Sequence, residues 1–142
     1  MGSHEASFDI EPSRAAVSAF ADQLAEFCDA QAVPSAVLNA FQVALDDVLT
    51  NIIDYSAPNA PVSTIRAHVS VMPDGLQVTV EDDGIAFDPL SAAEPNLDLD
   101  LDDRPIGGLG IHLVKTLMDE LEYQRVGNRN QLTMKKSLPS QA

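Results

Sequence analysis

The run ALDDVLTNIIDY, residues Ala44–Tyr55, decides the fold of this chain. Apolar residues recur in it at intervals of three and four, which predicts an amphipathic helix packed on a core. We expect this helix to begin at Pro34-Ser35, because proline suits the first turn of a helix, and to end near Tyr55. Asp47 and Asn51 fall one turn apart, at the edge between the buried and the solvent-facing sides. Taken alone, such a pair is typical of a solvated helix face.

The segments on either side of this helix predict a second helix and three strands. Ser7–Ile10 alternates like a short strand, and Ala15–Ala30 carries large apolar residues at helical spacing. Downstream, Ser63–Met72 and Gly75–Glu81 are rich in valine and isoleucine and flank the turn residues Pro73-Asp74-Gly75. This pattern predicts an antiparallel hairpin.

The rest of the chain predicts a long loop, a third helix and two final strands. Residues 82–105 are rich in aspartate and proline without a helical stripe, and a helix is expected from Ile106 to about Glu120. The last strands are expected near Leu121–Val126 and Gln131–Ser137, joined by the turn-like residues Gly127-Asn128-Arg129-Asn130. This order of elements predicts an α+β fold, a two-layer sandwich in which about three helices cover one face of a mixed β-sheet.

The charge of the chain narrows the kinds of partner that it can bind. Its 142 residues include 22 acidic and 8 basic side chains, and the formal net charge of -14 repels phosphate backbones and anionic lipids. We therefore expect no nucleic acid and no membrane among its partners. Length and composition predict a single domain over residues 1–142. The absence of a long apolar run or a signal-like start predicts a cytoplasmic protein.

Two features of the chain are expected to carry no function. The start Met1-Gly2-Ser3-His4 is typical of an expression tag, and residues 1–5 are expected to be tag or disordered. Cys28 has no second cysteine to pair with, so we interpret it as a small apolar residue on a helix.

Three spaced motifs turn the Asp47 and Asn51 pair into a candidate site. An acidic residue and Asn51 lie four positions apart on a helix, Asp82-x-Gly84 ends a strand, and Gly107-Gly108-x-Gly110 opens a helix after a long loop. Each motif is weak alone, because Asp-x-Gly is usually a turn and a glycine cluster is usually a tight loop. Their order and setting resemble the ATP-binding fold of gyrase-type ATPases and histidine kinases, the Bergerat-type fold.

The chain is more closely similar to the small bacterial anti-sigma factor serine kinases, which belong to this histidine-kinase-like ATPase superfamily. The resemblance covers about Phe8 to Leu138. It implies that Asn51 holds Mg²⁺ through its side-chain oxygen, and that Asp47 is the general base that orients an attacking hydroxyl. It also implies that Asp82 accepts a hydrogen bond from the adenine amine of ATP, while Gly84 lets the backbone approach the ring.

Further nucleotide contacts follow from the same resemblance. The glycines Gly107, Gly108 and Gly110 match a box whose backbone amides face the phosphates. Residues 87–105 would form the ATP lid. Three less regular positions complete the candidate set: Ala86 at the end of the first glycine box, Arg104 as a substitute for a phosphate-contacting arginine, and Asn130 near the position of a threonine that supports the adenine-reading aspartate in relatives.

The resemblance implies a protein serine/threonine kinase of a partner-switching pathway. Such a protein phosphorylates an anti-anti-sigma partner with a STAS domain and sequesters a sigma factor or another output protein, and some relatives form homodimers. Asp47 departs from the usual glutamate and is one methylene shorter. A second interpretation therefore stays open, in which the protein is a catalytically weak or inactive adaptor that binds nucleotide and switches partners without phosphoryl transfer.

Overall fold

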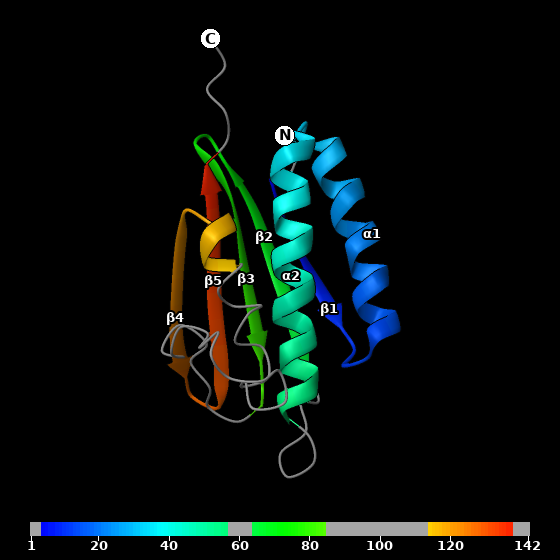
Figure 1. Cartoon of the computed structure of the whole chain (residues 1–142), viewed down its shortest axis with the longest axis vertical. Helices are drawn as coiled ribbons and strands as arrows, with labels where there is room; N and C mark the ends of the chain where they lie inside the picture. The colour runs from blue at the N-terminus through cyan, green and yellow to red at the C-terminus, as the bar shows by residue number, and fades with distance from the viewer. Residues whose placement is uncertain (1–3, 57–63, 85–113, 138–142) are drawn as a thin grey trace, which may run out of the picture.

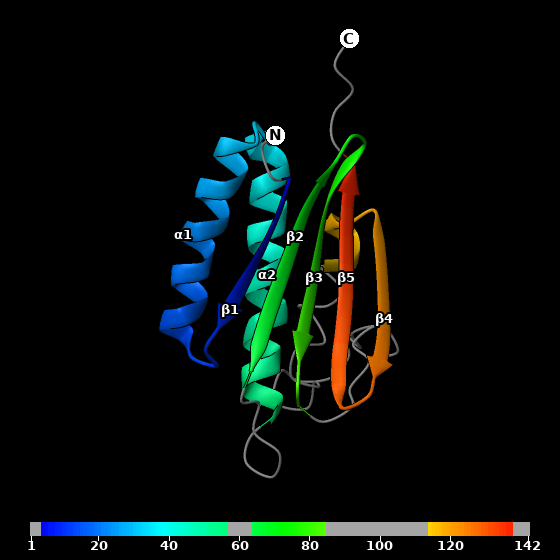
Figure 2. The ribbon, with the colours of Figure 1, turned by 180° about the vertical axis from the view of Figure 1, so that it is seen from behind.

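One β-sheet with helices on a single face forms the architecture of this protein, for which we use a computed structural model (Figure 1). The structure describes residues 4–56, 64–84 and 114–137. Its elements are β1 (Glu5–Ile10), α1 (Arg14–Ala30), α2 (Ser35–Ser56), β2 (Ile65–Met72), β3 (Gly75–Asp82), β4 (Glu120–Val126) and β5 (Arg129–Ser137). A short helical piece covers residues 114–117. Seen from behind, the sheet carries none of the described helices on its other face (Figure 2).

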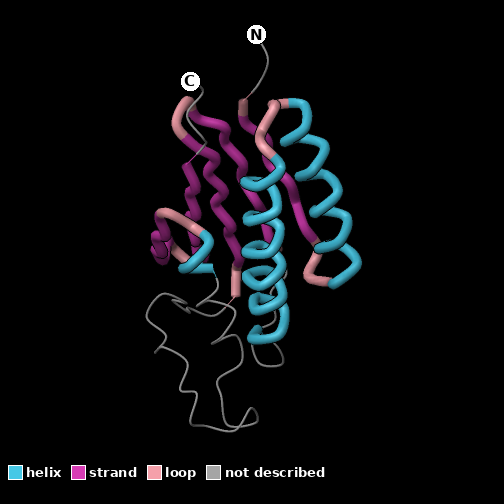
Figure 3. The backbone as a smooth tube through the Cα atoms, turned by 45° about the horizontal axis from the view of Figure 1, so that its top comes forward, coloured by secondary structure: helices cyan, strands magenta, loops and turns pink. Residues whose placement is uncertain are grey.

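The sheet has the strand order β1-β2-β3-β5-β4, and the expected mixed pairing is wrong for the described strands. All of their pairings are antiparallel. The reason lies in the connections. Because α1 and α2 run in opposite directions between β1 and β2, the chain returns to the sheet reversed (Figure 3). Two-residue turns then join β2 to β3 and β4 to β5, since Met72 pairs with Gly75 and Val126 with Arg129.

Several boundaries differ from those expected from the sequence, among them the start of β5 at Arg129 and not near Gln131. β1 begins at Glu5, which pairs with Ser70, so Glu5 belongs to the sheet and not to a disordered tag. β3 extends to Asp82. The last described helical residues are 114–117, and Glu120 already opens β4. The helical prediction overran because Leu117 and Met118 continue the apolar spacing, while the chain turns into the sheet at 118–119.

The core lies between the helices and the sheet, as the apolar spacing predicted. Ser13 caps α1 by accepting a hydrogen bond from the backbone of Ala16 at 3.2 Å. Phe41 and Leu49 of α2 are fully buried against alternate residues of the strands. Cys28 belongs to this core, and burial raises the pKa of its thiol to about 11. None of the described helices is long and apolar enough to cross a membrane.

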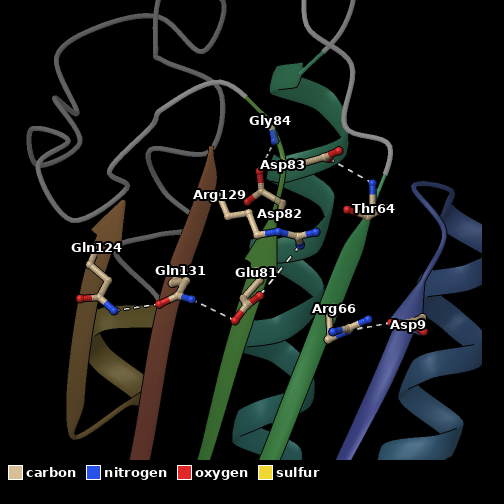
Figure 4. Close-up of polar contacts among 10 residues, drawn as sticks. All are labelled: Asp9, Thr64, Arg66, Glu81, Asp82, Asp83, Gly84, Gln124, Arg129 and Gln131. Carbon is tan, nitrogen blue, oxygen red and sulfur yellow. Dashed lines mark hydrogen bonds and ion pairs between the residues drawn. The ribbon is translucent and has the colours of Figure 1, made fainter. Parts of the chain in front are cut away.

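Polar side chains cover the opposite, open face of the sheet. Figure 4 shows one row of them across the strands, in which Asp9 pairs with Arg66 at 2.9 Å. In the same row, Gln131 donates to Glu81 at 3.0 Å and accepts from Gln124 at 2.8 Å. Such cross-strand pairs fix the register and keep this face compatible with water.

Gly75 opens β3 where there is no room for a side chain. A Cβ built there would lie 2.9 Å from the backbone oxygen of Lys136 and 3.2 Å from Cε of Lys135. We therefore expect Gly75→Ala to lower the free energy of unfolding by about 1–3 kcal/mol, measured by urea denaturation, because the β5 backbone must shift. The control is Gln77→Ala on the same strand, expected to change stability by less than about 0.5 kcal/mol. Equal midpoints for Gly75→Ala and wild type would contradict this packing.

Candidate functional site

Asp82 is the last residue of β3, and its buried carboxylate lies on the helix side of the sheet. Its residue is 5% exposed, although aspartate is rarely buried without partners. Oδ1 of Asp82 accepts a hydrogen bond from the backbone N–H of Gly84 at 2.9 Å and one from Nδ2 of Asn130 at 3.1 Å. In the part of the chain that the structure describes, both hydrogen bonds to this carboxylate therefore use the same oxygen. Figure 4 shows Asp82 and Gly84 at the end of β3, with α2 behind the strands.

Asn130 connects this carboxylate to two residues of β4. The register pairs Asn130 with both Asp82 and Arg125, and Asn130 is only 7% exposed. Its Oδ1 accepts hydrogen bonds from the hydroxyl of Tyr123 at 2.5 Å and from Nη1 of Arg125 at 3.1 Å. Nη1 of Arg125 also donates to the backbone oxygen of Gly84 at 2.9 Å. We call the set Asp82, Gly84, Tyr123, Arg125 and Asn130 the Asp82 network.

Asn130 was a candidate from the family resemblance, whereas Tyr123 and Arg125 were missed. Alternation along β4 puts both of them on the helix side, and a turn of two residues after Val126 sets Arg125 opposite Asn130. The four-residue turn expected from the sequence left that register undefined. The signal that could have found them was therefore the Gly127-Asn128 pair, which is typical of a two-residue hairpin.

Asp47 lies on α2, half-buried beside the buried residues Ala44 and Val48. Loss of hydration raises the pKa of its carboxyl group, and the negative charge of the neighbouring Asp46 raises it further. Asn51 follows one turn later in α2, but its side chain is outside the described part of the structure. The C-terminal half of α2 and the C-terminal end of β3 lie at the same end of the molecule (Figures 1 and 2). The fold therefore brings the helix that carries Asp47 and Asn51 toward the end of the sheet that carries Asp82.

A raised pKa in the folded state gives Asp47 a testable effect on stability. Folded protein then holds the proton more tightly than unfolded protein, so the contribution of Asp47 to stability is fully present below its unfolded pKa and is lost as pH rises through the raised folded pKa. We therefore expect Asp47→Asn to be more stable than wild type at pH 7.5 and this difference to shrink toward pH 4.5. Urea unfolding over that range measures it, with the exposed Asp22→Asn on α1 as the charge-removal control. A constant difference would contradict the burial of the charged form.

A hollow of about 410 Å³ follows the α1 and α2 pair. Its lining includes Asp46 and Asp47, and no residue of the Asp82 network contributes to it. Nε2 of Gln42 donates to the backbone oxygen of Ala21 at 3.3 Å, so Gln42 faces α1. The hollow is thus a feature of the helix pair and separate from the Asp82 network.

Several predicted site residues lie outside the described part of the structure. They are Ala86, Arg104, Gly107, Gly108 and Gly110, together with the predicted lid at 87–105. Within residues 4–56, 64–84 and 114–137, no three histidine, cysteine, aspartate or glutamate side chains gather as a metal site would require. Of the predicted site residues, Asp82, Gly84 and Asn130 are therefore joined by hydrogen bonds. Asp47 and Asn51 lie on α2, whose C-terminal half is at the same end of the fold.

Sequence comparison identifies the class of protein. Residues 10–136 match the family described as the histidine kinase-like ATPase domain. The chain belongs to this family, which confirms the resemblance drawn from the spaced motifs.

Two curated relatives narrow the comparison. The chain is 34% identical to the serine/threonine-protein kinase BtrW of Bordetella bronchiseptica over 89 residues, which cover 63% of each protein. It is also 30% identical to an anti-sigma F factor of Clostridium perfringens over 129 residues, 89% of this chain and 86% of that protein. The aligned part of BtrW is thus less than two thirds of its length.

Solved structures confirm the fold. The RsbU and RsbW domains of Rv1364c from Mycobacterium tuberculosis align with a TM-score of 0.66 and 10% identity, over 96% of this chain and 33% of that one. A blue-light activated histidine kinase domain from Erythrobacter litoralis aligns with a TM-score of 0.52 and 23% identity, over 87% of this chain and 60% of that one. At such identities the likeness concerns the fold alone.

Proposed function

We propose that this protein binds ATP and acts as an anti-sigma regulatory factor with protein serine kinase activity. The observation that carries the proposal is the buried Asp82 carboxylate in a chain of the histidine kinase-like ATPase family. A buried ionised carboxylate accepts hydrogen bonds and cannot donate them. With Oδ1 already bonded to Gly84 and Asn130, the group suits a ligand that brings a hydrogen-bond donor to Oδ2.

Adenine offers such a donor in its exocyclic amine. Guanine carries a carbonyl oxygen at the same ring position, which a carboxylate repels, so Asp82 would select adenine over guanine. Gly84 has no side chain to hold the base away from the strand end. Among the common nucleotides, this chemistry fits ATP and ADP best.

The remaining nucleotide contacts are assigned by sequence position. Asn51 would hold Mg²⁺, a hard cation that prefers oxygen ligands and that binds the nucleotide phosphates as well. The glycines Gly107, Gly108 and Gly110 would leave backbone amides free for the phosphates, which matters in a protein of net charge -14. Arg104 would add the positive charge, Ala86 would flank the base, and residues 87–105 would cover the nucleotide as a lid.

Asp47 would act as the general base of phosphoryl transfer. It would orient a serine hydroxyl of the protein substrate and accept its proton, while the terminal phosphoryl group of ATP moves to that oxygen. A general base works best when its pKa is near the working pH, and burial raises the pKa of Asp47 in that direction. Charge repulsion from Asp46 has the same effect.

The proposed partners rest on the family resemblance, together with the names of two curated relatives. One of these is named a serine/threonine-protein kinase and another an anti-sigma F factor. We propose a STAS-domain anti-anti-sigma protein as the phosphorylated partner, a sigma factor or other output protein as the sequestered one, and a homodimer as one form of the kinase. Because of the negative net charge, we propose neither nucleic acid nor a membrane as a partner. A cytoplasmic location stays a prediction from the sequence.

A second candidate function is an adaptor that binds nucleotide without phosphoryl transfer. Asp47 favours it, because aspartate holds its carboxylate about one bond length further from the substrate than the usual glutamate. A misplacement of about 1 Å can lower a rate by on the order of a hundredfold. Nucleotide binding through Asp82 would not suffer from this change.

Incubation with γ-labelled ATP, Mg²⁺ and a STAS-type protein from the same genome separates the two candidates. A kinase transfers label to a serine of that protein, and a partner variant with alanine at that serine serves as the control. Clear ATP binding without labelled serine would contradict the kinase and leave the adaptor. Label on the kinase itself, with none on the partner, would contradict the proposed substrate.

A further inference from the structure

The amide of Asn130 has to face one way for the Asp82 network to work. A side-chain amide presents an accepting oxygen on one side and a donating NH₂ on the other. Only the NH₂ side can bond to an ionised carboxylate, and in the structure it donates to Oδ1 of Asp82 at 3.1 Å. If the amide turned over, its oxygen would face the carboxylate and repel it. The orientation of Asn130 therefore decides whether it supports or opposes the charge of Asp82.

Two donors from β4 hold that orientation. The hydroxyl of Tyr123 and Nη1 of Arg125 both donate to Oδ1 of Asn130. In the reversed orientation, both donors would face the NH₂ group, and Asn130 is only 7% exposed, so water would replace the lost bonds poorly. The guanidinium of Arg125 further favours the observed orientation of the Asn130 amide over the reversed one, because hydrogen bonds from a charged donor are stronger than neutral ones.

Arg125 also fixes the backbone that follows Asp82. Its Nη1 donates to the carbonyl oxygen of Gly84 at 2.9 Å, while the N–H of Gly84 donates to Oδ1 of Asp82. The same guanidinium thus restrains Gly84 and Asn130, which are the two partners of that carboxylate oxygen. Within residues 4–56, 64–84 and 114–137, both hydrogen bonds to the Asp82 carboxylate use Oδ1, which leaves Oδ2 to meet a ligand.

We infer that Tyr123 and Arg125 are positioning residues that determine adenine selectivity, because they orient the Asn130 amide and so direct Oδ2 of Asp82 to the base. This inference rests on the proposed nucleotide binding. Tyr123 and Arg125 contact Asn130, and Arg125 also contacts Gly84. Their effect passes through Asn130, so it should change the discrimination between bases more than the affinity for the phosphates.

The test compares the dissociation constants of ADP and inosine diphosphate, in which a 6-oxo group replaces the adenine amine. Wild type is expected to prefer ADP. The double variant Tyr123→Phe/Arg125→Met should lower that preference by about tenfold, because the Asn130 amide then loses both donors at its oxygen and is held less firmly against Asp82. Each single variant should lower it by a smaller factor, about threefold, so the single variants carry the test if the double variant fails to fold.

Gln124→Ala is the matched control. Gln124 lies between the two residues on the same strand and bonds across to Gln131 on the open face, so it perturbs β4 without touching the Asp82 network. Its preference for ADP should equal that of wild type. A double variant that folds and keeps the wild-type preference would overturn the inference, and so would an equal loss in Gln124→Ala.

A second readout needs no nucleotide. The side-chain amide signal of Asn130 in an ¹⁵N correlation spectrum, assigned by its loss in Asn130→Ser, should move or broaden in the double variant and stay in place in Gln124→Ala. An unchanged signal in the double variant would overturn the inference. If wild type binds no ADP, the proposed function fails, and this spectrum still decides whether Tyr123 and Arg125 orient the amide.

Discussion

Replacing Asp82 by asparagine is expected to weaken ADP binding by about a hundredfold or more. Gly84 and Asn130 both donate hydrogen bonds to Oδ1, so they would keep the oxygen of the new amide at that position. Its NH₂ group would then take the place of Oδ2 and face the adenine amine, donor against donor. The same NH₂ would suit the carbonyl oxygen of guanine, so the preference for ADP over GDP should fall further than the affinity for ADP. Isothermal titration with both nucleotides measures both effects.

Asp83→Asn is the control for this substitution. Asp83 is the next residue along the chain and carries the same charge, but its Oδ1 accepts from the backbone N–H of Thr64 at 3.1 Å and has no part in the Asp82 network (Figure 4). Its ADP affinity should stay within about threefold of wild type. Wild-type affinity and selectivity in a folded Asp82→Asn variant would show that the base binds elsewhere.

Replacing Asp47 by alanine is expected to slow phosphoryl transfer by about a hundredfold or more, since a positioned general base contributes about 10²–10⁴ in rate. ADP affinity should change by less than about threefold, because Asp47 would contact the attacking hydroxyl and not the base. Asp47→Glu should raise the rate above wild type, because the extra methylene brings the carboxylate closer to that hydroxyl. Initial rates of label transfer to the STAS-type partner measure all three proteins.

Asp46→Ala supplies the matched control for Asp47. Asp46 is exposed on α2 and has no proposed contact with either substrate, so its effect would come only through the pKa of Asp47. At a pH where the Asp47 carboxyl group is fully deprotonated, the rate of Asp46→Ala should remain within about threefold of wild type. A wild-type rate in Asp47→Ala would rule out the general-base role. Transfer by Asp47→Glu but not by wild type would identify the natural protein as the adaptor.

The helices and hairpins could be predicted because their signals are local. Apolar spacing and Pro34 determine α2, and the turn at Pro73-Asp74 determines the β2–β3 hairpin. The direction of pairing between β1 and β2 is not local, since it depends on how α1 and α2 return the chain to the sheet. The predicted mixed sheet was wrong for that reason.

The candidate site was predictable to the extent that its residues lie in spaced motifs. Asp82 and Gly84 belong to one of these motifs, and Asn130 was a less regular candidate. The structure joins all three by hydrogen bonds, while their contact with a nucleotide stays a prediction. Tyr123 and Arg125 could not be found in this way, because their contacts depend on which residue of β4 faces which residue of β5. One shifted pair in that hairpin would turn both side chains to the open face.

Adenine-nucleotide binding is the claim on which the proposed kinase, its selectivity and the role of the Asp82 network all depend. Thermal unfolding of the wild-type protein with Mg²⁺ and 1 mM ADP, beside the same concentration of GDP, tests it most directly. We expect ADP to raise the midpoint by about 5 °C or more, since a ligand that binds only the folded state stabilises it, and GDP to leave it within about 1 °C. Equal midpoints with ADP, with GDP and without nucleotide would contradict the claim.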